Sequence, residues 1–481
     1  MTRLHRSIIL TAALALPLGA CVPASQTRSS VASASAVPIK APAPKAKNVI
    51  LFIGDGMGIS TVTAARIYAG QKLGLSGEEH VLPFERFGNV ALVKTYNTNA
   101  QVADSAGTTS AMHTGKKTNI GMLGIGPEAR RGDCADSLQH RLPLLGEQVK
   151  QRGLALGIVT TTRITHATPA AVYAHAPDRD WESDAAIPKA QRGKGCTDIA
   201  SQLVSKQFDV ALGGGRAVFF GGEQGGRRLD PGADLPAVWT AASGGSYVET
   251  AAELEAAPQG KPVLGLFSPS HMTYMVDRAG DSAEPTLTEM TAAAIGRLDQ
   301  DPDGYYLMVE GGRIDHGHHA GQAGYALEEA VEFARAIQYA IDHTDPDETL
   351  ILVTAGHSHV FTMAGYPRRG NPILGLVVPP GERDAEHAGT AGGPRLAADG
   401  KPYTTLGYGN GPGAIANMAE RPMPETGVHA HQQATVPMGS ETHGGEDVAL
   451  YGQGPGAERV RGVIEQNLIY DIIVKALGWN D

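Results

Sequence analysis

The sequence predicts an α/β protein in which one large, mostly parallel sheet is covered by helices on both faces. Short apolar runs of strand length recur along the 481 residues, and helical patterns lie between several of them, which is the order that builds a parallel sheet. Polar residues that could act in catalysis or metal binding follow these runs directly or within a short loop. Because functional loops gather at the carboxyl ends of parallel strands, we expect these residues to meet at one edge of the sheet.

Each predicted helix or strand rests on a local pattern in the sequence. Buried strands are continuous apolar runs, which predicts strands at residues 48–53, 90–96, 154–160, 209–212, 263–267, 305–309 and 349–354. Helical periodicity predicts helices at 284–298, 323–343 and 458–477, and small residues predict a closely packed helix from 105 to 115. From 365 to 439 the composition shifts to Gly, Pro and Ala with little periodicity, which predicts an inserted, loop-rich subdomain.

The first 47 residues indicate export. Arg3 and Arg6 precede an apolar run from 8 to 18, which is typical of a signal peptide. The end of this run, Leu-Gly-Ala-Cys, is similar to the lipobox of bacterial lipoproteins. We therefore expect removal of residues 1–20 and lipidation of Cys21, with ordinary secretion as the alternative. Residues 21–47 are Ala, Ser, Pro and Lys with little to bury, which predicts a disordered linker.

Composition and charge narrow the classes of function. The chain is 42% hydrophobic, with 61 glycines and 30 prolines, as in a soluble globular protein with many loops. Loss of Arg3 and Arg6 with the signal would change the formal net charge from −10 to −12. An acidic exported protein is a poor candidate for binding nucleic acid, so we expect no nucleic-acid partner. The lipid anchor at Cys21 is the only membrane contact that we expect.

Beyond Cys21, the chain has two cysteines, Cys134 and Cys196. An oxidising compartment favours a disulfide between them, and closing a loop of that length would stabilise the fold by about 4 kcal/mol in the chain-entropy account. The alternative is two unpaired thiols in the core.

Two acidic sites at strand ends are candidates for binding a cation. Asp55 follows the strand at 48–53 between two glycines, which leave room for close approach of a metal; a turn-capping role is the alternative. Asp315 and His319 follow the strand at 305–309. Their i, i+4 spacing puts a carboxylate and an imidazole on one helical face, where both can bind one divalent cation. A solvated His-rich loop is the alternative for this pair.

Ser105 stands in the first turn of the predicted helix from 105 to 115. Serine is a preferred helix N-cap, yet the same position is where unpaired N–H groups and the helix dipole favour an alkoxide and a phosphate. Thr168, Glu310 and His357 also follow strand-like runs. Three glycines at 213–215 lack the spacing of a dinucleotide fingerprint and predict a tight turn.

Taken together, four motifs resemble those of alkaline phosphatases, in that family's order. They are IGDGMG at 53–58, DSAGTTSA at 104–111, VEGGRIDHGHH at 309–319 and ETHGGEDV at 441–448. The sequence resembles the animal members more than the enterobacterial ones, since His166 and His316 stand where the latter carry Asp and Lys. Residues 365–439, including DGKPYTTLGYGNGPG, resemble the crown domain of the animal enzymes, and Cys134 and Cys196 match the ends of a disulfide in that branch.

The resemblance implies an alkaline phosphatase domain from 48 to 481, with Ser105 as the nucleophile and a phosphoseryl intermediate on the path to inorganic phosphate. It implies that Arg179 binds two phosphate oxygens in a fork. It also implies two zinc ions and one magnesium ion. The first zinc would be held by Asp315, His319 and His443, the second by Asp55 and His357, and the magnesium by Asp55, Thr168 and Glu310, with His166 and His316 as outer groups.

One departure from the family pattern affects the second zinc. Members of the family carry Asp-His where this chain carries Gly356-His357. Glycine has no side chain to bind a cation, so we expect weaker zinc binding at this site and activity that depends on added metal. The animal branch has Glu where Ser268 stands, so we do not expect the calcium of that branch.

The leading hypothesis is a phosphate-monoester hydrolase of the cell envelope, in the periplasm or on the outer surface. A related hydrolase of phosphodiesters or sulfates is one rival, and a non-catalytic phosphate or metal binder, suggested by Gly356, is another. Because dimers are common in the family, we expect a homodimer.

Overall fold

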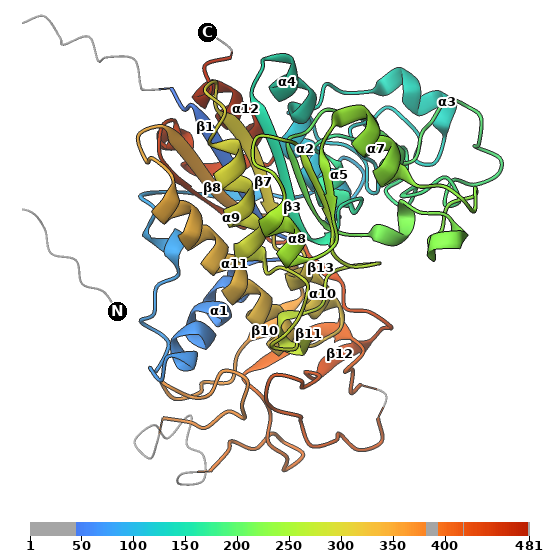
Figure 1. Ribbon diagram of the computed structural model, residues 1–481. Helices are drawn as coiled ribbons and strands as arrows, with labels where there is room; N and C mark the ends of the chain where they lie inside the picture. The colour runs from blue at the N-terminus through green and yellow to red at the C-terminus, as the bar shows by residue number, and fades with distance from the viewer. Residues whose placement is uncertain (1–44, 381–392, 417, 480–481) are drawn as a thin grey trace, which may run out of the picture. The chain divides into compact units, whose positions relative to one another are not determined.

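A ten-stranded, mostly parallel sheet is the centre of this computed structural model, as the sequence predicts (Figure 1). The structure describes residues 45–380, 393–416 and 418–479. In spatial order the strands are β15 (Gly462–Glu465), β2 (Asn89–Lys94), β14 (Val448–Gln453), β8 (Thr349–Ala355), β1 (Asn48–Gly54), β7 (Tyr305–Glu310), β3 (Ala155–Arg163), β4 (Val210–Gly214), β6 (Val263–Leu266) and β5 (Ser246–Val248). Among them, β14 runs antiparallel to both of its neighbours.

The register of the three middle strands brings their polar ends together. β1 pairs in parallel with β7 on one side and β8 on the other, so Ile53 lies beside both Glu310 and Thr354. Every residue of these three strands is buried, which explains their continuous apolar runs. The chain therefore delivers Asp55 and Glu310 to the same edge of the sheet, and His357 follows two residues after β8.

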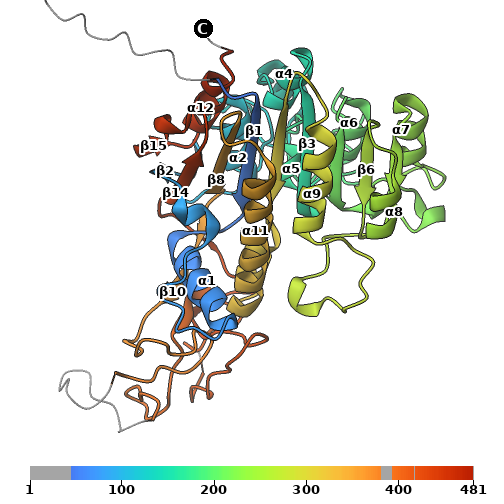
Figure 2. The same cartoon turned by 60° about the vertical axis from the view of Figure 1, so that its left-hand side comes forward.

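Helices pack on both faces of the sheet (Figure 2). One group contains α1 (Ile59–Lys72), α8 (Ala251–Ala256), α9 (Leu287–Leu298) and α11 (Ala323–His343), and the other contains α2 (Ser105–Thr114), α4 (Leu145–Gln151), α5 (Ala167–Ala170) and α12 (Leu468–Ala476). The remaining helices are α3 (Cys134–Ser137), α6 (Ile199–Ser205), α7 (Leu235–Ser243) and α10 (Arg313–His319). α10 carries Asp315 and His319 on one short helix, as their spacing predicts.

The predicted loop-rich insertion is largely irregular in its described part. It follows β9 (Ser358–His359) and β10 (Phe361–Met363), and a small sheet joins β10 to β11 (Leu406–Gly411) and β12 (Ala434–Pro437). Antiparallel pairing of β9 with β13 (His443–Gly444) closes its base. The crown-like identity of residues 365–439 stays a prediction.

The single helix predicted at 458–477 is wrong. The chain instead forms a short 3₁₀ turn, then the edge strand β15, and only then α12 from Leu468 to Ala476. β15 adds in parallel to β2. Gly462, which has a positive φ of 73° at the start of β15, explains the break, since glycine readily adopts this conformation and weakens a helix.

A disulfide joins Cys134 and Cys196, which confirms that pairing over two free thiols. Within the described residues no helix has both the length and the apolar character needed to cross a membrane. The predicted signal peptide, Cys21 and nearly all of the predicted linker lie outside the described residues.

Glu329 is a charged side chain buried on α11, with 3% of its surface exposed. Its carboxylate accepts a hydrogen bond of 2.7 Å from the Met275 backbone N–H. Burial raises the pKa of Glu329 to about 7, although this hydrogen bond, Arg313 and Arg278 favour the charged form. The ionised carboxylate therefore lowers the stability of the fold as pH rises from about 4.5 towards 7.

We expect Glu329→Gln to raise the free energy of unfolding at pH 9 by about 2 to 3 kcal/mol, because one unit of pKa difference corresponds to about 1.4 kcal/mol. The effect should be much smaller at pH 5, where the folded carboxyl is already protonated. Urea unfolding at both pH values and fixed metal concentration measures this. Glu348→Gln, at a side chain that is 53% exposed, serves as the control, and an equal gain at both pH values would contradict the burial argument.

Candidate active site

Ser105 begins helix α2 and lies buried at the edge of the sheet. Asp104, and not Ser105, is the N-cap: its side chain accepts from the Gly107 backbone N–H at 3.0 Å. The capping alternative for Ser105 is therefore wrong, and its hydroxyl is free for other partners. The fully buried, small-residue helix places this hydroxyl against the ends of β1 and β8.

Two acceptors compete for the single proton of the Ser105 hydroxyl. Its Oγ lies 3.0 Å from Asp55 Oδ2 and 3.1 Å from His357 Nε2. Nδ1 of His357 is 3.2 Å from the Ser358 carbonyl, which can only accept, so Nδ1 carries the proton and Nε2 presents a lone pair. Ser105 thus faces a carboxylate and an unprotonated imidazole nitrogen, an arrangement that suits a nucleophile.

Arg179 is held beside Ser105 from two sides. One terminal nitrogen, NH1, donates to Asp104 Oδ2 at 3.0 Å, and the other, NH2, donates to His166 Nε2 at 3.0 Å. Burial opposes ionisation of Asp104, but Arg179 and two backbone N–H groups hold the pKa of this carboxyl below its ordinary value. Each terminal nitrogen of Arg179 keeps a further N–H, which is the fork that binds two oxygens of a phosphate.

His319 and His443 bring two lone pairs together. The Nδ1 atoms of His319 and His443 donate to the carbonyls of Glu441 (2.6 Å) and Ala103 (2.7 Å), so both Nε2 atoms lack protons when the rings are neutral. These Nε2 atoms are 3.1 Å apart, and Asp315 lies 3.4 Å from each of them. Two lone pairs and a carboxylate at this separation repel one another unless a cation lies between them, which fits a zinc site.

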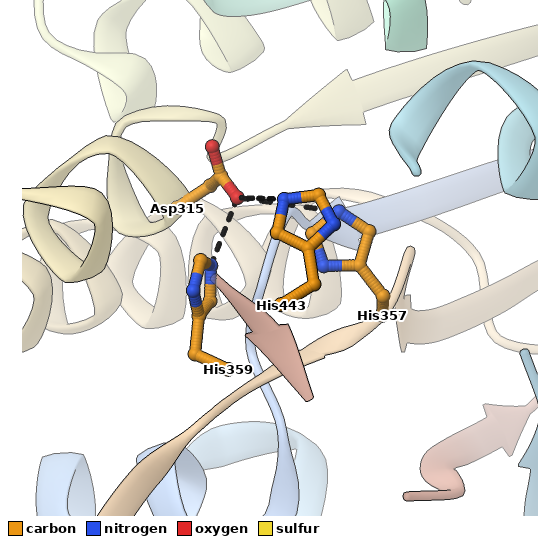
Figure 3. A group of neighbouring side chains, drawn as sticks. All are labelled: Asp315, His357, His359 and His443. Atoms are coloured by element: carbon orange, nitrogen blue, oxygen red, sulfur yellow. Dashed lines mark hydrogen bonds and ion pairs between the residues drawn. The ribbon is translucent and has the colours of Figure 1, made fainter. Parts of the chain in front are cut away.

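His359 sits beside this cluster and has a different role (Figure 3). Its two nitrogens lie 2.8 Å from Asp315 Oδ1 and 2.5 Å from Glu441 Oε2. Burial favours the neutral ring, but the hydrogen bonds to the two carboxylates raise the pKa of His359 to about 9. As an imidazolium, His359 donates at both nitrogens and orients Asp315, which excludes it as a ligand in this arrangement although its position is close enough for one.

A second group of donors surrounds Asp55 and Glu310. Four buried polar atoms here have no hydrogen-bond partner among the described residues: Asp55 Oδ1, His166 Nδ1, Thr168 Oγ1 and Glu310 Oε1. Burial is the main cause that raises the pKa of Asp55 to about 7 and that of Glu310 to about 8. Buried oxygen atoms left unpaired in this way fit a hard cation such as magnesium.

His166 and His316 each accept a hydrogen bond from an arginine. Because Arg179 donates to His166 Nε2, Nδ1 must carry the proton of a neutral ring and cannot bind a metal directly. Arg313 donates to His316 Nδ1 at 3.0 Å. Burial is the main cause that lowers the pKa of His166 well below its ordinary value and that of His316 to about 3. Both rings are therefore neutral, and their role as outer groups of a metal site stays a prediction.

Gly356 adjoins the pair formed by Asp55 and His357. A Cβ at this position would lie 2.9 Å from Asp55 Oδ1 and 3.3 Å from Thr108 Oγ1, with nothing else within 4 Å. A longer side chain at 356 would therefore start against the Asp55 carboxylate, which would have to shift slightly to admit it, with open space on the other sides. His357 Nε2 lies 3.3 Å from Asp55 Oδ1. The two predicted ligands of the second zinc are therefore close together, and glycine at 356 adds no third.

The fold and the site define a class: an α/β enzyme with clustered metal donors around a buried serine at the carboxyl edge of its sheet. The family profile for alkaline phosphatase matches residues 46–479. The chain belongs to the alkaline phosphatase family and is an enzyme of that class.

Relatives agree with this assignment. The tissue-nonspecific alkaline phosphatase of Gallus gallus is 46% identical over 88% of this chain and 83% of its own length, and that of Homo sapiens is 43% identical over 90% and 83%. Among solved structures, alkaline phosphatase of Thermus thermophilus aligns with a TM-score of 0.66 at 25% identity, covering 91% of this chain and 92% of its own. The enzyme from the Antarctic bacterium TAB5 has a TM-score of 0.63 at 23% identity, with 92% and 100% covered.

The structure brings Ser105 together with Asp55 and His357, and Asp315 together with His319 and His443. The roles that the resemblance implies for these residues stay predictions. Sequence reasoning missed His359 and Glu441. Both lie within two residues of a predicted ligand, and the pattern His-Ser-His at 357–359 was a possible signal for the first.

We expect Glu441→Gln to weaken zinc binding at the cluster of Asp315 by about 10- to 100-fold, as losing an outer-shell partner does. Glutamine can still accept from the Val360 backbone N–H, which now donates to Glu441, but it removes one of the two carboxylates that hold His359. Competition with a chelator measures the affinity. Glu458→Gln, at a 54% exposed side chain, is the control, and unchanged affinity in Glu441→Gln would refute the orienting role.

Proposed function

We propose that this enzyme hydrolyses phosphate monoesters through a phosphoserine intermediate on Ser105. The observation that carries the proposal is the position of the Ser105 hydroxyl between Asp55 and His357, next to an arginine fork held by Asp104. A nucleophile, acceptors for its proton and a phosphate-binding arginine are the parts that such a reaction needs.

The residues divide the work as follows. Ser105 Oγ loses its proton and forms a bond to phosphorus as the bond to the ester oxygen breaks, and the leaving alcohol takes up a proton. Arg179 holds two phosphoryl oxygens throughout and keeps the phosphorus in line with Oγ. Water then attacks the phosphoserine, which releases inorganic phosphate and restores the Ser105 hydroxyl.

The donor groups fit two zinc ions and one magnesium ion. Asp315, His319 and His443 would hold one zinc, Asp55 and His357 the second, and Asp55, Thr168 and Glu310 the magnesium. When bound, these cations supply Lewis-acid stabilisation of negative charge on oxygen during phosphoryl transfer. His166 and His316 would meet the magnesium only through water, because their accepting nitrogens are occupied by arginines.

A phosphodiesterase and a non-catalytic binder are the alternative functions. Arg179 and the donors for a third cation together favour monoesters, because their combined positive charge matches a doubly charged terminal phosphate that a diester lacks. A mere binder has no need of a buried serine with two acceptors for its proton.

Replacing Ser105 tests the function. With zinc and magnesium supplied, we expect monoester turnover faster than diester turnover, and a phosphorylated Ser105 in acid-quenched samples examined by mass spectrometry. Ser105→Ala should lose the label and at least about 10³-fold of kcat. Ser110→Ala on the same helix is the control for folding. Faster diester turnover would select the first alternative, and absence of turnover under all metal conditions would select the second.

Gly356 supports a further part of the proposal: the second zinc site is weakened. The pair formed by Asp55 and His357 offers two protein ligands, whereas zinc in proteins usually has three or four. The space beside Gly356 is where a third carboxylate would begin. Binding at this site should therefore be weak, and activity should rise with added zinc.

We expect Gly356→Asp to raise zinc occupancy of the second site and the rate by about tenfold or more, as the gain of a direct ligand would suggest. Metal content by mass spectrometry and monoesterase rate, compared at limiting zinc, measure this. Gly356→Asn, which adds similar volume without the charge, separates ligation by a carboxylate from simple filling of space. Equal metal content and rate in Gly356→Asp and the parent would mean that the site needs no third side chain.

Export, lipid anchoring at Cys21 and dimerisation complete the proposed setting in the cell envelope. The Cys134–Cys196 disulfide supports export, since such bonds persist in oxidising compartments. Membrane attachment that survives Cys21→Ser would exclude the anchor, and a monomeric mass in solution would exclude the dimer.

A further inference from the structure

Three arginine–histidine pairs line the site next to Glu310. Arg179 donates to His166 and Arg313 donates to His316, as described above. The third pair joins Arg163, at the end of β3, to His271, in the loop that follows β6: NH1 of Arg163 contacts Nε2 of His271. A guanidinium can only donate, so this imidazole nitrogen accepts.

His271 is the ring that links the other two histidines. Its ring centroid lies 4.2 Å from that of His316 and 5.4 Å from that of His166, both in edge-to-face geometry. His166 and His316 lie 5.6 Å apart in the same manner. The three rings therefore form one packed group, and removal of His271 would take away a contact from each of its partners.

Arg163 is itself rigidly held. Its Nε and NH2 donate to the carboxylate of Glu182 at 2.8 and 2.6 Å, and Thr165 donates to the same carboxylate at 2.5 Å. This bidentate pair fixes the plane of the guanidinium. The loop that bears His271 is also tied to the sheet edge, because the Met272 backbone N–H donates to the Thr161 carbonyl at 3.0 Å. The position of His271 is therefore fixed both by Arg163 and by the backbone of its own loop.

The orientation of His166 decides the orientation of Arg179. Nε2 of His166 is one of the two protein acceptors that hold the Arg179 guanidinium, and Asp104 is the other. Nδ1 of His166 has no hydrogen-bond partner among the described residues, so apart from Arg179 this side chain is held by packing against the rings of His271 and His316. If His166 turned away, Arg179 would keep only the Asp104 bond and could rotate about it.

We propose that His271 is a positioning residue for phosphate binding: it holds His166 in the orientation that accepts from Arg179 and thereby aligns the Arg179 fork. The inference rests on the proposed function, in which that fork receives the phosphoryl oxygens. Nothing in the arrangement requires His271 to touch the substrate. Its contribution passes through His166 to Arg179.

A double-mutant cycle tests this route. In the parent enzyme we expect His271→Ala to lower kcat/KM about tenfold, mainly through KM, and to raise the inhibition constant of inorganic phosphate by a similar factor, as outer-shell losses do. In an Arg179→Ala background the same change should alter both quantities by less than about twofold, because coupled residues are not additive. Calorimetric titration with inorganic phosphate measures the same cycle without turnover.

Two further variants separate positioning from damage to the loop. His271→Gln retains an acceptor for Arg163 and should restore part of the loss, whereas Thr273→Ala, whose hydroxyl contacts Glu284 in the same loop, should behave like the parent. Equal losses from His271→Ala in both backgrounds, or no loss in the parent, would overturn the inference. A parent without monoesterase activity under any metal condition would refute the proposed function instead.

Discussion

The facing lone pairs of His319 and His443 are the constraint on which the rest of the site depends. Each ring is fixed by a backbone carbonyl on its far side, so neither Nε2 can take up a proton without charging a ring beside another imidazole. Their separation of 3.1 Å is tolerable only with a positive charge between them. The same demand recurs at Asp55 Oδ1 and Glu310 Oε1, two buried oxygens that lack a donor among the described residues. These groups of lone pairs and carboxylate oxygens would be stabilised by bound cations, and the helices and strands fix the positions of the donor atoms.

Arginines and one charged histidine provide the fixed positive charge that keeps these sites ordered. His359 lies between two carboxylates, and Arg179 neutralises Asp104. His166 and His316 accept hydrogen bonds from arginines, so their accepting nitrogens are not available to a metal. Each histidine ring discussed above thus has a defined proton position. That position separates the candidate ligands, which present a lone pair, from the residues that orient them.

Much of the fold and the site could be predicted from the sequence, for a specific reason. β1, β7 and β8 are buried on both faces, so each is a continuous apolar run that ends at a polar residue, and parallel pairing aligns these ends. The roles of His359, Glu441 and His271 could not be predicted, because each depends on contacts between residues 44 to 108 positions apart or on loops with no periodicity. The predicted helix at 458–477 failed because its apolar residues support both a helix and the edge strand β15, and pairing with β2 decided between them.

The short pairing of β9 with β13 has a consequence for how this chain can change. His359 lies opposite His443 in that pair, so the segment from 360 to 442 connects the two strands of one hairpin. The stem of this hairpin carries a candidate metal ligand, His443, and the histidine that contacts Asp315. Length and composition at the tip of a hairpin can vary without disturbing the register of the stem. A change in length at an outer loop of the insertion would therefore leave the pairing that places His443 beside Asp315 unchanged.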